Sequence, residues 1–239
     1  MKEFIINKSH HILLDGLKID ADTVAEAAVM TNRYFRNHIK SNEDIQFYNA
    51  IMEGNGLSAG IGALFNSYMS DLSRGNLMIN PYKCGKPDLI NVSYADSDKK
   101  IQQYKDHLKE FKSYPFGGIE TKSTMIRQCK NLGWGIQRIK YSKSFSWKAH
   151  HNENENLCGI VWDFVDEIPQ IVAIMYCDKL YKEDWGKFHS VEKKTIGGYS
   201  LSKGGTQKMR DGWICVLNNK DYINGFNFET EIEGEVSLW

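Results

Sequence analysis

Two short segments of the chain place carboxylates close to a lysine. Asp88 lies in Lys-Pro-Asp-Leu-Ile at 86–90, and Glu120 and Lys122 lie in Gly-Ile-Glu-Thr-Lys-Ser-Thr at 118–124. Both segments read as strands. Residues two apart on a strand point to the same face, so Glu120 and Lys122 should project together while Thr121 faces the other way. An acid and a lysine on one face, near a second carboxylate, suit joint action on an ion and an anionic substrate.

Hydrolysis of a phosphodiester is a reaction that such a set of groups could carry out. It needs a hard cation held by oxygen ligands, an activated water, and positive charge to offset the phosphate. We expect Asp88 and Glu120 to hold Mg²⁺, with the backbone carbonyl of Thr121 completing the metal shell. Lys122 would orient the water and neutralise developing charge. The prediction requires that Asp88, Glu120 and Lys122 converge in space.

This arrangement resembles the PD-(D/E)xK nuclease superfamily, in which Pro-Asp on one strand and Glu-x-Lys on the next form the active site. Pro87-Asp88 and Glu120-Thr121-Lys122 carry the resemblance, which covers roughly residues 57–177. It implies a mixed sheet flanked by helices. The superfamily includes most type II restriction endonucleases, together with repair and recombination nucleases.

The chain departs from the pattern at two points. A helix is expected between Asp88 and Glu120, where many members have a short hairpin. Many members also carry an acidic residue on the helix before the first strand. The corresponding helix here offers Asn66, so this extra acid is either absent or supplied by Glu53.

A basic segment follows the Glu-x-Lys motif. Residues 121–152 contain no Asp or Glu, whereas the tail after Lys220 contains acids and no basic residue. Cations contact phosphates, and Arg or Gln can contact base edges. The alternative is a solvated basic surface with core aromatics. The candidate DNA-binding residues are Arg127, Gln137, Arg138, Lys140, Lys143 and Lys148. The adjacent His150 and His151 would point apart on a strand, which favours a phosphate contact or plain surface over a chelate.

The segment Lys203-Gly-Gly-Thr-Gln-Lys-Met-Arg210 is rich in Gly and Lys, but it lacks the spacing of a P-loop. No nucleotide cofactor is therefore expected. This segment is interpreted either as a DNA-contacting loop or as a surface loop.

Composition and the distribution of apolar residues favour a soluble globular protein. The chain has 239 residues, 41% of them hydrophobic, and a net charge of zero. The five cysteines form no CxxC pair, which favours reduced thiols over disulfides or zinc. The first apolar run is too short for a signal peptide, and no stretch approaches a membrane span. A soluble, cytoplasmic protein is expected.

Periodicity predicts one α+β domain with a central mixed sheet flanked by helices. Residues 1–75 should be mainly helical, 76–217 should hold the catalytic sheet and DNA-contacting loops, and 218–239 should be an acidic tail. The predicted helices cover 20–40, 41–53, 58–74 and 97–112, with a turn at Gly54-Asn55-Gly56. The predicted strands cover 89–92, 116–124 and 213–217, and a hairpin joins 157–166 to 168–177. Residues 179–212 are expected to form loops.

Three hypotheses remain. The first is a Mg²⁺-dependent type II restriction endonuclease that cuts double-stranded DNA as a twofold homodimer. The second is a repair, phage or mobile-element nuclease that prefers structure to sequence. The third is a non-catalytic DNA-binding or interaction module in which the motif is accidental.

Overall fold

A mixed β-sheet forms the centre of the molecule. The computed structural model describes residues 3–41, 44, 54–83, 85–93, 101, 108–126, 135–149, 155–189, 198–228 and 236–238. The strand order is β13-β1-β12-β9-β8-β6-β5-β4. The strands are β1 Phe4–Asn7, β4 Leu77–Ile79, β5 Leu89–Asn91, β6 Gly118–Met125, β8 Leu157–Val165, β9 Ile168–Cys177, β12 Trp213–Leu217 and β13 Val236–Leu238.

Neighbouring strands of this sheet are antiparallel, except that β6 and β8 run parallel. A parallel pair requires a crossover connection, and the chain between Met125 and Leu157 provides it. The prediction of a single α+β domain with a mixed sheet is confirmed.

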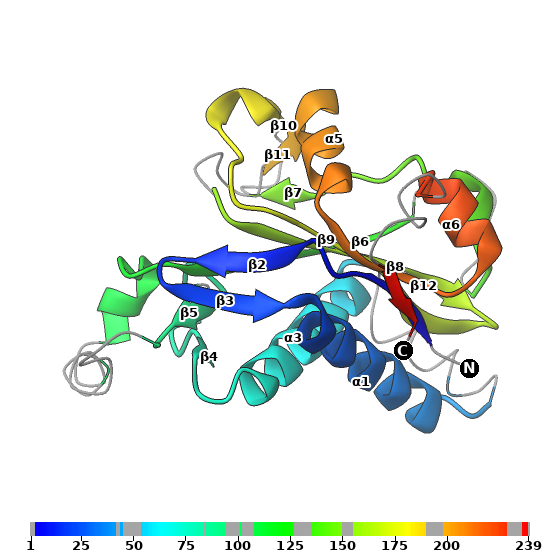
Figure 1. The fold of residues 1–239 in the computed structure, drawn as a ribbon, viewed down its shortest axis with the longest axis horizontal. Helices are drawn as coiled ribbons and strands as arrows, with labels where there is room; N and C mark the ends of the chain where they lie inside the picture. The colour runs from blue at the N-terminus through cyan, green and yellow to red at the C-terminus, as the bar shows by residue number, and fades with distance from the viewer. Residues whose placement is uncertain are drawn as a thin grey trace.

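Different elements cover the two faces of the sheet (Figure 1). Helices α1 Ala21–His38 and α3 Gly54–Leu72 lie on one face, with the hairpin β2 His11–Leu14 and β3 Leu17–Asp20 beside them. The other face carries α5 Lys203–Asp211, α6 Lys220–Phe226 and a small sheet. The small sheet has the order β10-β11-β7, with β10 Trp185–His189, β11 Gly198–Leu201 and β7 Lys148–Ala149. Short 3₁₀ turns occur at Leu108–Lys112, Ile139–Tyr141 and Lys182–Asp184.

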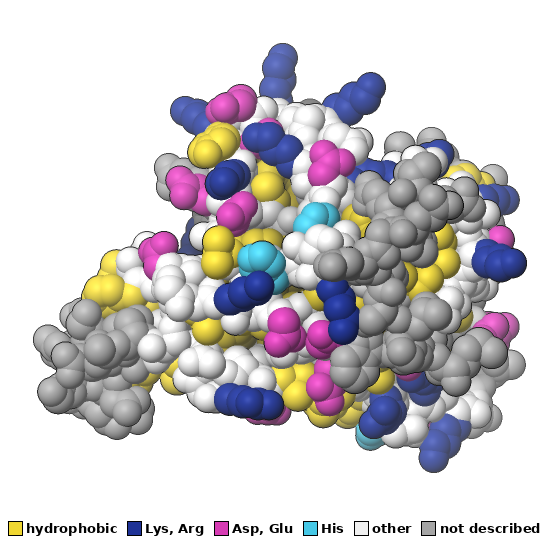
Figure 2. Space-filling view, in the orientation of Figure 1, with side chains coloured by type: hydrophobic (Ala, Val, Ile, Leu, Met, Phe, Trp, Pro, Cys, Tyr) yellow, Lys and Arg dark blue, Asp and Glu magenta, His cyan; other side chains and the backbone are white. Residues whose placement is uncertain are grey.

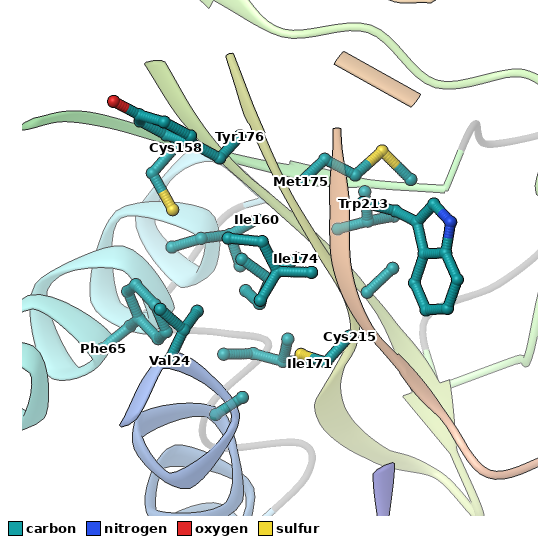
Figure 3. Close-up of a cluster of buried hydrophobic side chains, with 14 of the residues drawn as sticks. Val24, Phe65, Cys158, Ile160, Ile171, Ile174, Met175, Tyr176, Trp213 and Cys215 are labelled. Carbon is teal, nitrogen blue, oxygen red and sulfur yellow. The ribbon is translucent and has the colours of Figure 1, made fainter. Parts of the chain in front are cut away.

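The main core lies between the sheet and the two N-terminal helices. Figure 3 shows Val24 of α1 and Phe65 of α3 pointing toward Ile160 and Ile174 of the sheet, while Trp213 lies on the opposite face. All five side chains are fully buried. Both faces of β8 and β9 are therefore covered, which explains their nearly continuous apolar sequences.

Local side-chain and backbone signals fix several boundaries of the helices and strands. The Asp20 side chain accepts a hydrogen bond from the Thr23 backbone N–H at 2.7 Å and caps α1. Ser41 and Asp44 exchange capping-box hydrogen bonds, whereas most of the predicted helix after Ser41 lies outside the described residues. The β8–β9 hairpin turns at Asp166 and Glu167, both with positive φ (51° and 66°), as a two-residue turn of the twist-matching type requires.

Other local predictions differ from the structure in part, or lie mainly outside the described residues. The predicted turn at Gly54–Gly56 lies within α3, and the first twenty residues contribute β1, β2 and β3. The segment 179–212, predicted to form loops, contains β10, β11 and α5. Of the predicted helix at 97–112, Ile101 is helical and Leu108–Lys112 is a 3₁₀ turn, while most of the remainder is not described. The predicted acidic tail includes α6 and β13.

Helix α5 escaped prediction because of its glycines. The Ser202 side chain caps it by accepting a hydrogen bond from the Gly205 N–H at 3.1 Å. A Cβ at residue 205 would lie 2.3 Å from the Asp184 carbonyl oxygen, so only glycine permits this close packing. Among the described helices, none is long and apolar enough to cross a membrane.

Candidate active site

The pairing of β5 with β6 brings Asp88 beside the Glu-x-Lys segment. Leu89 lies opposite Ile119, and Ile90 lies opposite Gly118. Gly118 has a φ of 155°, and a Cβ there would lie 2.1 Å from the Leu89 carbonyl oxygen. Glycine is therefore required for β6 to approach β5 this closely. Asp88, directly before β5, is thereby held against Thr121.

The Asp88 carboxylate is anchored through one of its oxygens. Asp88 Oδ2 accepts hydrogen bonds from the backbone N–H of Thr121 at 2.8 Å and from its hydroxyl at 3.1 Å. Neither contact involves Oδ1. The Thr121 hydroxyl in turn accepts a hydrogen bond from Asn66 Nδ2 of α3 at 2.8 Å.

The Lys122 ammonium lies close to all three predicted oxygen ligands. Its Nζ lies 2.5 Å from Glu120 Oε1 and 3.6 Å from Asp88 Oδ2. The same Nζ donates to the Thr121 carbonyl oxygen at 3.0 Å. The prediction that Asp88, Glu120 and Lys122 converge is therefore confirmed.

Glu120 is buried and only half satisfied. Its side chain is 8% exposed, compared with 34% for Asp88. The Lys122 ammonium contacts Oε1, but Oε2 is buried without a hydrogen-bond partner among the residues that the structure describes. Burial without a donor is costly for a carboxylate oxygen, so this atom is available to a further cation or donor.

The electrostatics of the pair follow from burial and proximity. Burial raises the pKa of the Glu120 carboxyl, Lys122 lowers it, and Asp88 raises it further, with the pKa above the usual value as the net result. Burial alone would lower the pKa of the Lys122 ammonium, but Glu120 and Asp88 outweigh burial and raise it. Lys122 is therefore a stable positive charge between two carboxylates.

The donor set fits a hard cation. One carboxylate oxygen from Asp88, one from Glu120 and the Thr121 carbonyl oxygen all surround the Lys122 ammonium, which marks a place where positive charge is stabilised. Oxygens of this kind suit Mg²⁺ or Mn²⁺. Within the described ranges, no group of three or more His, Cys, Asp or Glu side chains could hold a metal, so a cation here would depend on two acids and a carbonyl.

The possible extra acid, Glu53, lies outside the described residues. Helix α3 instead contributes Asn66, which stands where many members of the superfamily carry an acid. Its contact with Thr121 was missed. The available signal was a polar residue on the apolar stripe of the helix formed by Ile61, Leu64 and Phe65.

The predicted DNA-contacting residues divide into several groups. Arg127, His150 and His151 are outside the described part of the chain. Lys140, Lys143 and Lys148 are exposed, and Gln137 donates to the Tyr222 hydroxyl at 3.3 Å. Lys140 also lies over the Tyr141 ring.

The prediction that Arg138 contacts DNA was wrong. Its side chain is fully buried, and its Nη1 lies 3.9 Å from Asp163 Oδ1 and donates to the Ile136 carbonyl oxygen at 2.7 Å. A base-reading side chain must reach the surface, so Arg138 is withdrawn as a DNA contact. The interpretation of 203–210 as a loop is also corrected, because these residues lie in α5.

Lys148 is the exposed basic candidate that can be placed near the site. Lys122 lies opposite Gly159 in the parallel pair, and the ring of Trp147 lies 2.5 Å from the position that a Cβ on residue 159 would take. The Thr124 hydroxyl donates to the Ser146 carbonyl oxygen at 3.2 Å. The segment containing Lys148 therefore lies over β6 and β8, on the face to which Lys122 belongs.

Comparisons of the chain with protein-family models, with curated proteins and with solved structures gave no match.

Proposed function

We propose that this protein is a Mg²⁺-dependent endonuclease that hydrolyses phosphodiester bonds of double-stranded DNA. The observation that carries the proposal is the meeting of Asp88, Glu120 and the Thr121 carbonyl oxygen around the Lys122 ammonium. These groups come from two strands whose sequences resemble the PD-(D/E)xK motif. The mixed sheet flanked by helices agrees with the fold that this resemblance implies.

Each residue of the set has a distinct task. Asp88, Glu120 and the Thr121 carbonyl would hold the cation, which when bound supplies Lewis-acid activation of phosphate and water. Lys122 would offset charge on the phosphate and orient the attacking water. Glu120 Oε2, buried without a partner among the described residues, gives the site a further oxygen for the cation.

The charge of the chain is suited to modest, selective contact with DNA. Lys148 is exposed on the same face of the sheet as Lys122. Figure 2 shows acidic and basic side chains mixed on the face that it displays, and the chain has no net charge. Non-specific affinity for DNA depends mainly on phosphate neutralisation, so a mixed surface limits indiscriminate binding.

The test is a digest of supercoiled plasmid by the purified protein, with Mg²⁺ and with excess EDTA. Conversion to nicked or linear DNA only with Mg²⁺ is expected. Discrete fragments would identify a site-specific restriction-type enzyme, and a continuous smear would identify a nuclease without sequence preference. DNA that stays supercoiled under both conditions, although the protein binds it, would favour a non-catalytic DNA-binding module and contradict the proposal.

A further inference from the structure

A chain of side-chain hydrogen bonds connects helix α3 to Asp88. Asn66 Nδ2 donates to the Thr121 hydroxyl at 2.8 Å, and that hydroxyl donates to Asp88 Oδ2 at 3.1 Å. The Thr121 backbone N–H donates to the same Oδ2 at 2.8 Å. Two donors on Oδ2 restrict rotation of the Asp88 carboxylate. The direction in which Oδ1 points is therefore also restricted.

Asn66 is an unfavourable residue for its position. It lies in the interior of α3, where Asn has a lower helix propensity than Ala or Leu. Only 8% of it is exposed, and its Oδ1 is buried without a hydrogen-bond partner among the described residues. A half-satisfied buried amide costs stability, which an apolar side chain at this position would avoid.

The neighbouring positions show that this interface could have been apolar. Ile61 and Phe65 of the same helix are fully buried, and Gly62 packs against Ser123 of β6. The polar contact with Thr121 therefore lies beside closely packed apolar positions of the helix–sheet interface. It is directed at the residue that anchors Asp88.

We propose that Asn66 is a positioning residue that acts through the Thr121 hydroxyl to hold Asp88 in the orientation needed for cation binding. The inference rests on the proposed function, because it assigns Asp88 to the cation. Asn66 itself contacts neither the cation nor the substrate. It orients the hydroxyl so that the hydroxyl proton points at Asp88, and loss of such an outer partner typically weakens metal affinity by about 10- to 100-fold.

The test is a calorimetric titration of the full-length, DNA-free protein with Mn²⁺. Asn66→Ala and Thr121→Val should each raise the dissociation constant by about tenfold or more. The double variant should be little worse than either single variant, because both remove the same connection. Thr121→Ser keeps the hydroxyl and should restore near wild-type affinity.

Asn32→Ala supplies a matched control. Asn32 is also a buried asparagine on a helix, but on α1, where it bonds the backbone of Ile171 at 3.0 Å and 2.6 Å. The Asn32→Ala variant should have a lower melting temperature but an unchanged affinity for Mn²⁺. If Asn66→Ala does not fold, Thr121→Val and Thr121→Ser decide the question.

Two failures are distinguishable. Wild-type protein that binds Mn²⁺ and cuts DNA, while Asn66→Ala and Thr121→Val bind Mn²⁺ equally well, would overturn this inference alone. An equal loss of affinity in Asn32→Ala would also overturn it, since the effect would then be general destabilisation. Wild-type protein that neither binds Mn²⁺ nor cuts DNA would overturn the proposed function together with the inference.

Discussion

The same face of the sheet carries two buried charged groups that differ in how their carboxylates are satisfied. Asp163 of β8 accepts hydrogen bonds from the backbone N–H groups of Arg138 and Phe164 and from the Tyr222 hydroxyl, at 2.7 to 2.8 Å. Both of its oxygens therefore have donors. Glu120 of β6 has the Lys122 ammonium on one oxygen, while its other oxygen is buried without a partner among the described residues.

The pKa values of Asp163 and Glu120 shift in the same direction and therefore do not distinguish the two carboxylates. Burial raises the pKa of Asp163, against the lowering effect of its hydrogen bonds and of Arg138. Burial also raises the pKa of Glu120. The difference lies in the donors: Asp163 has a closed set of neutral and charged partners, whereas two acids share the Lys122 ammonium. We infer that the first group is structural and that the second is built to receive another charge.

The largest expected effect is the loss of DNA cleavage in the Glu120→Gln variant. This change keeps the shape of the side chain but removes a charged cation ligand, so Mg²⁺-dependent cleavage should fall by on the order of 10²-fold or more. The measurement is the initial rate of plasmid cleavage at saturating Mg²⁺. Asp163→Asn is the matched control on the same face, and a comparable loss of cutting per folded molecule in that variant would erase the distinction.

Asp163→Ala should have the largest effect on stability. It leaves Arg138 buried without its carboxylate, and breaking a buried ion pair in this way costs about 3–5 kcal/mol. Urea denaturation followed by circular dichroism measures the loss. Glu120→Ala should cost less, because its carboxylate has fewer hydrogen bonds to lose. The reverse order of the two losses would contradict the assignment of Asp163 as structural.

A smaller effect concerns pH. Because the pKa of Asp163 is raised above 3.8 in the folded state, the folded protein binds this proton more tightly than the unfolded chain. Its contribution to stability is present below 3.8 and declines as the pH rises through the raised value. The stability of the wild type relative to Asp163→Asn should therefore decrease over this window. If the stability of the wild type relative to Asp163→Asn rises with pH instead, the pKa of Asp163 is lowered in the folded protein.

The smallest effect is expected at the surface. Lys148→Ala should weaken DNA binding at all sequences alike and reduce the dependence of log affinity on log salt by about one unit. Lys18, exposed on the β2–β3 hairpin, supplies the control. Affinities of both variants are measured at several salt concentrations. Equal slopes for Lys148→Ala and Lys18→Ala would remove Lys148 from the proposed DNA surface.

The sequence predicted the candidate site better than its surroundings. Asp88, Glu120 and Lys122 could be placed together because strand periodicity and two short motifs act locally. Helix α1 and the β8–β9 hairpin were predictable for the same reason: Asp20 caps one, and Asp166-Glu167 turns the other. Each signal is contained within a few residues of the element that it specifies.

Features that depend on distant contacts could not be predicted in this way. Arg138 looked like a surface cation because its partner Asp163 lies 25 residues further along the chain. The glycines of α5 indicated a loop, yet Gly205 is needed for close packing against Asp184. Short strands such as β1 are specified mainly by their neighbours β12 and β13 rather than by their own four residues.

The most direct test of the account compares DNA cutting with DNA binding in Lys122→Ala. Lys122 is one cation among several that could contact DNA, but its ammonium bonds Glu120 and lies beside Asp88. The variant should bind a plasmid fragment with nearly wild-type affinity in the absence of metal, yet cut it orders of magnitude more slowly with Mg²⁺. Cleavage at a near wild-type rate would show that Lys122 is not catalytic and would contradict the account.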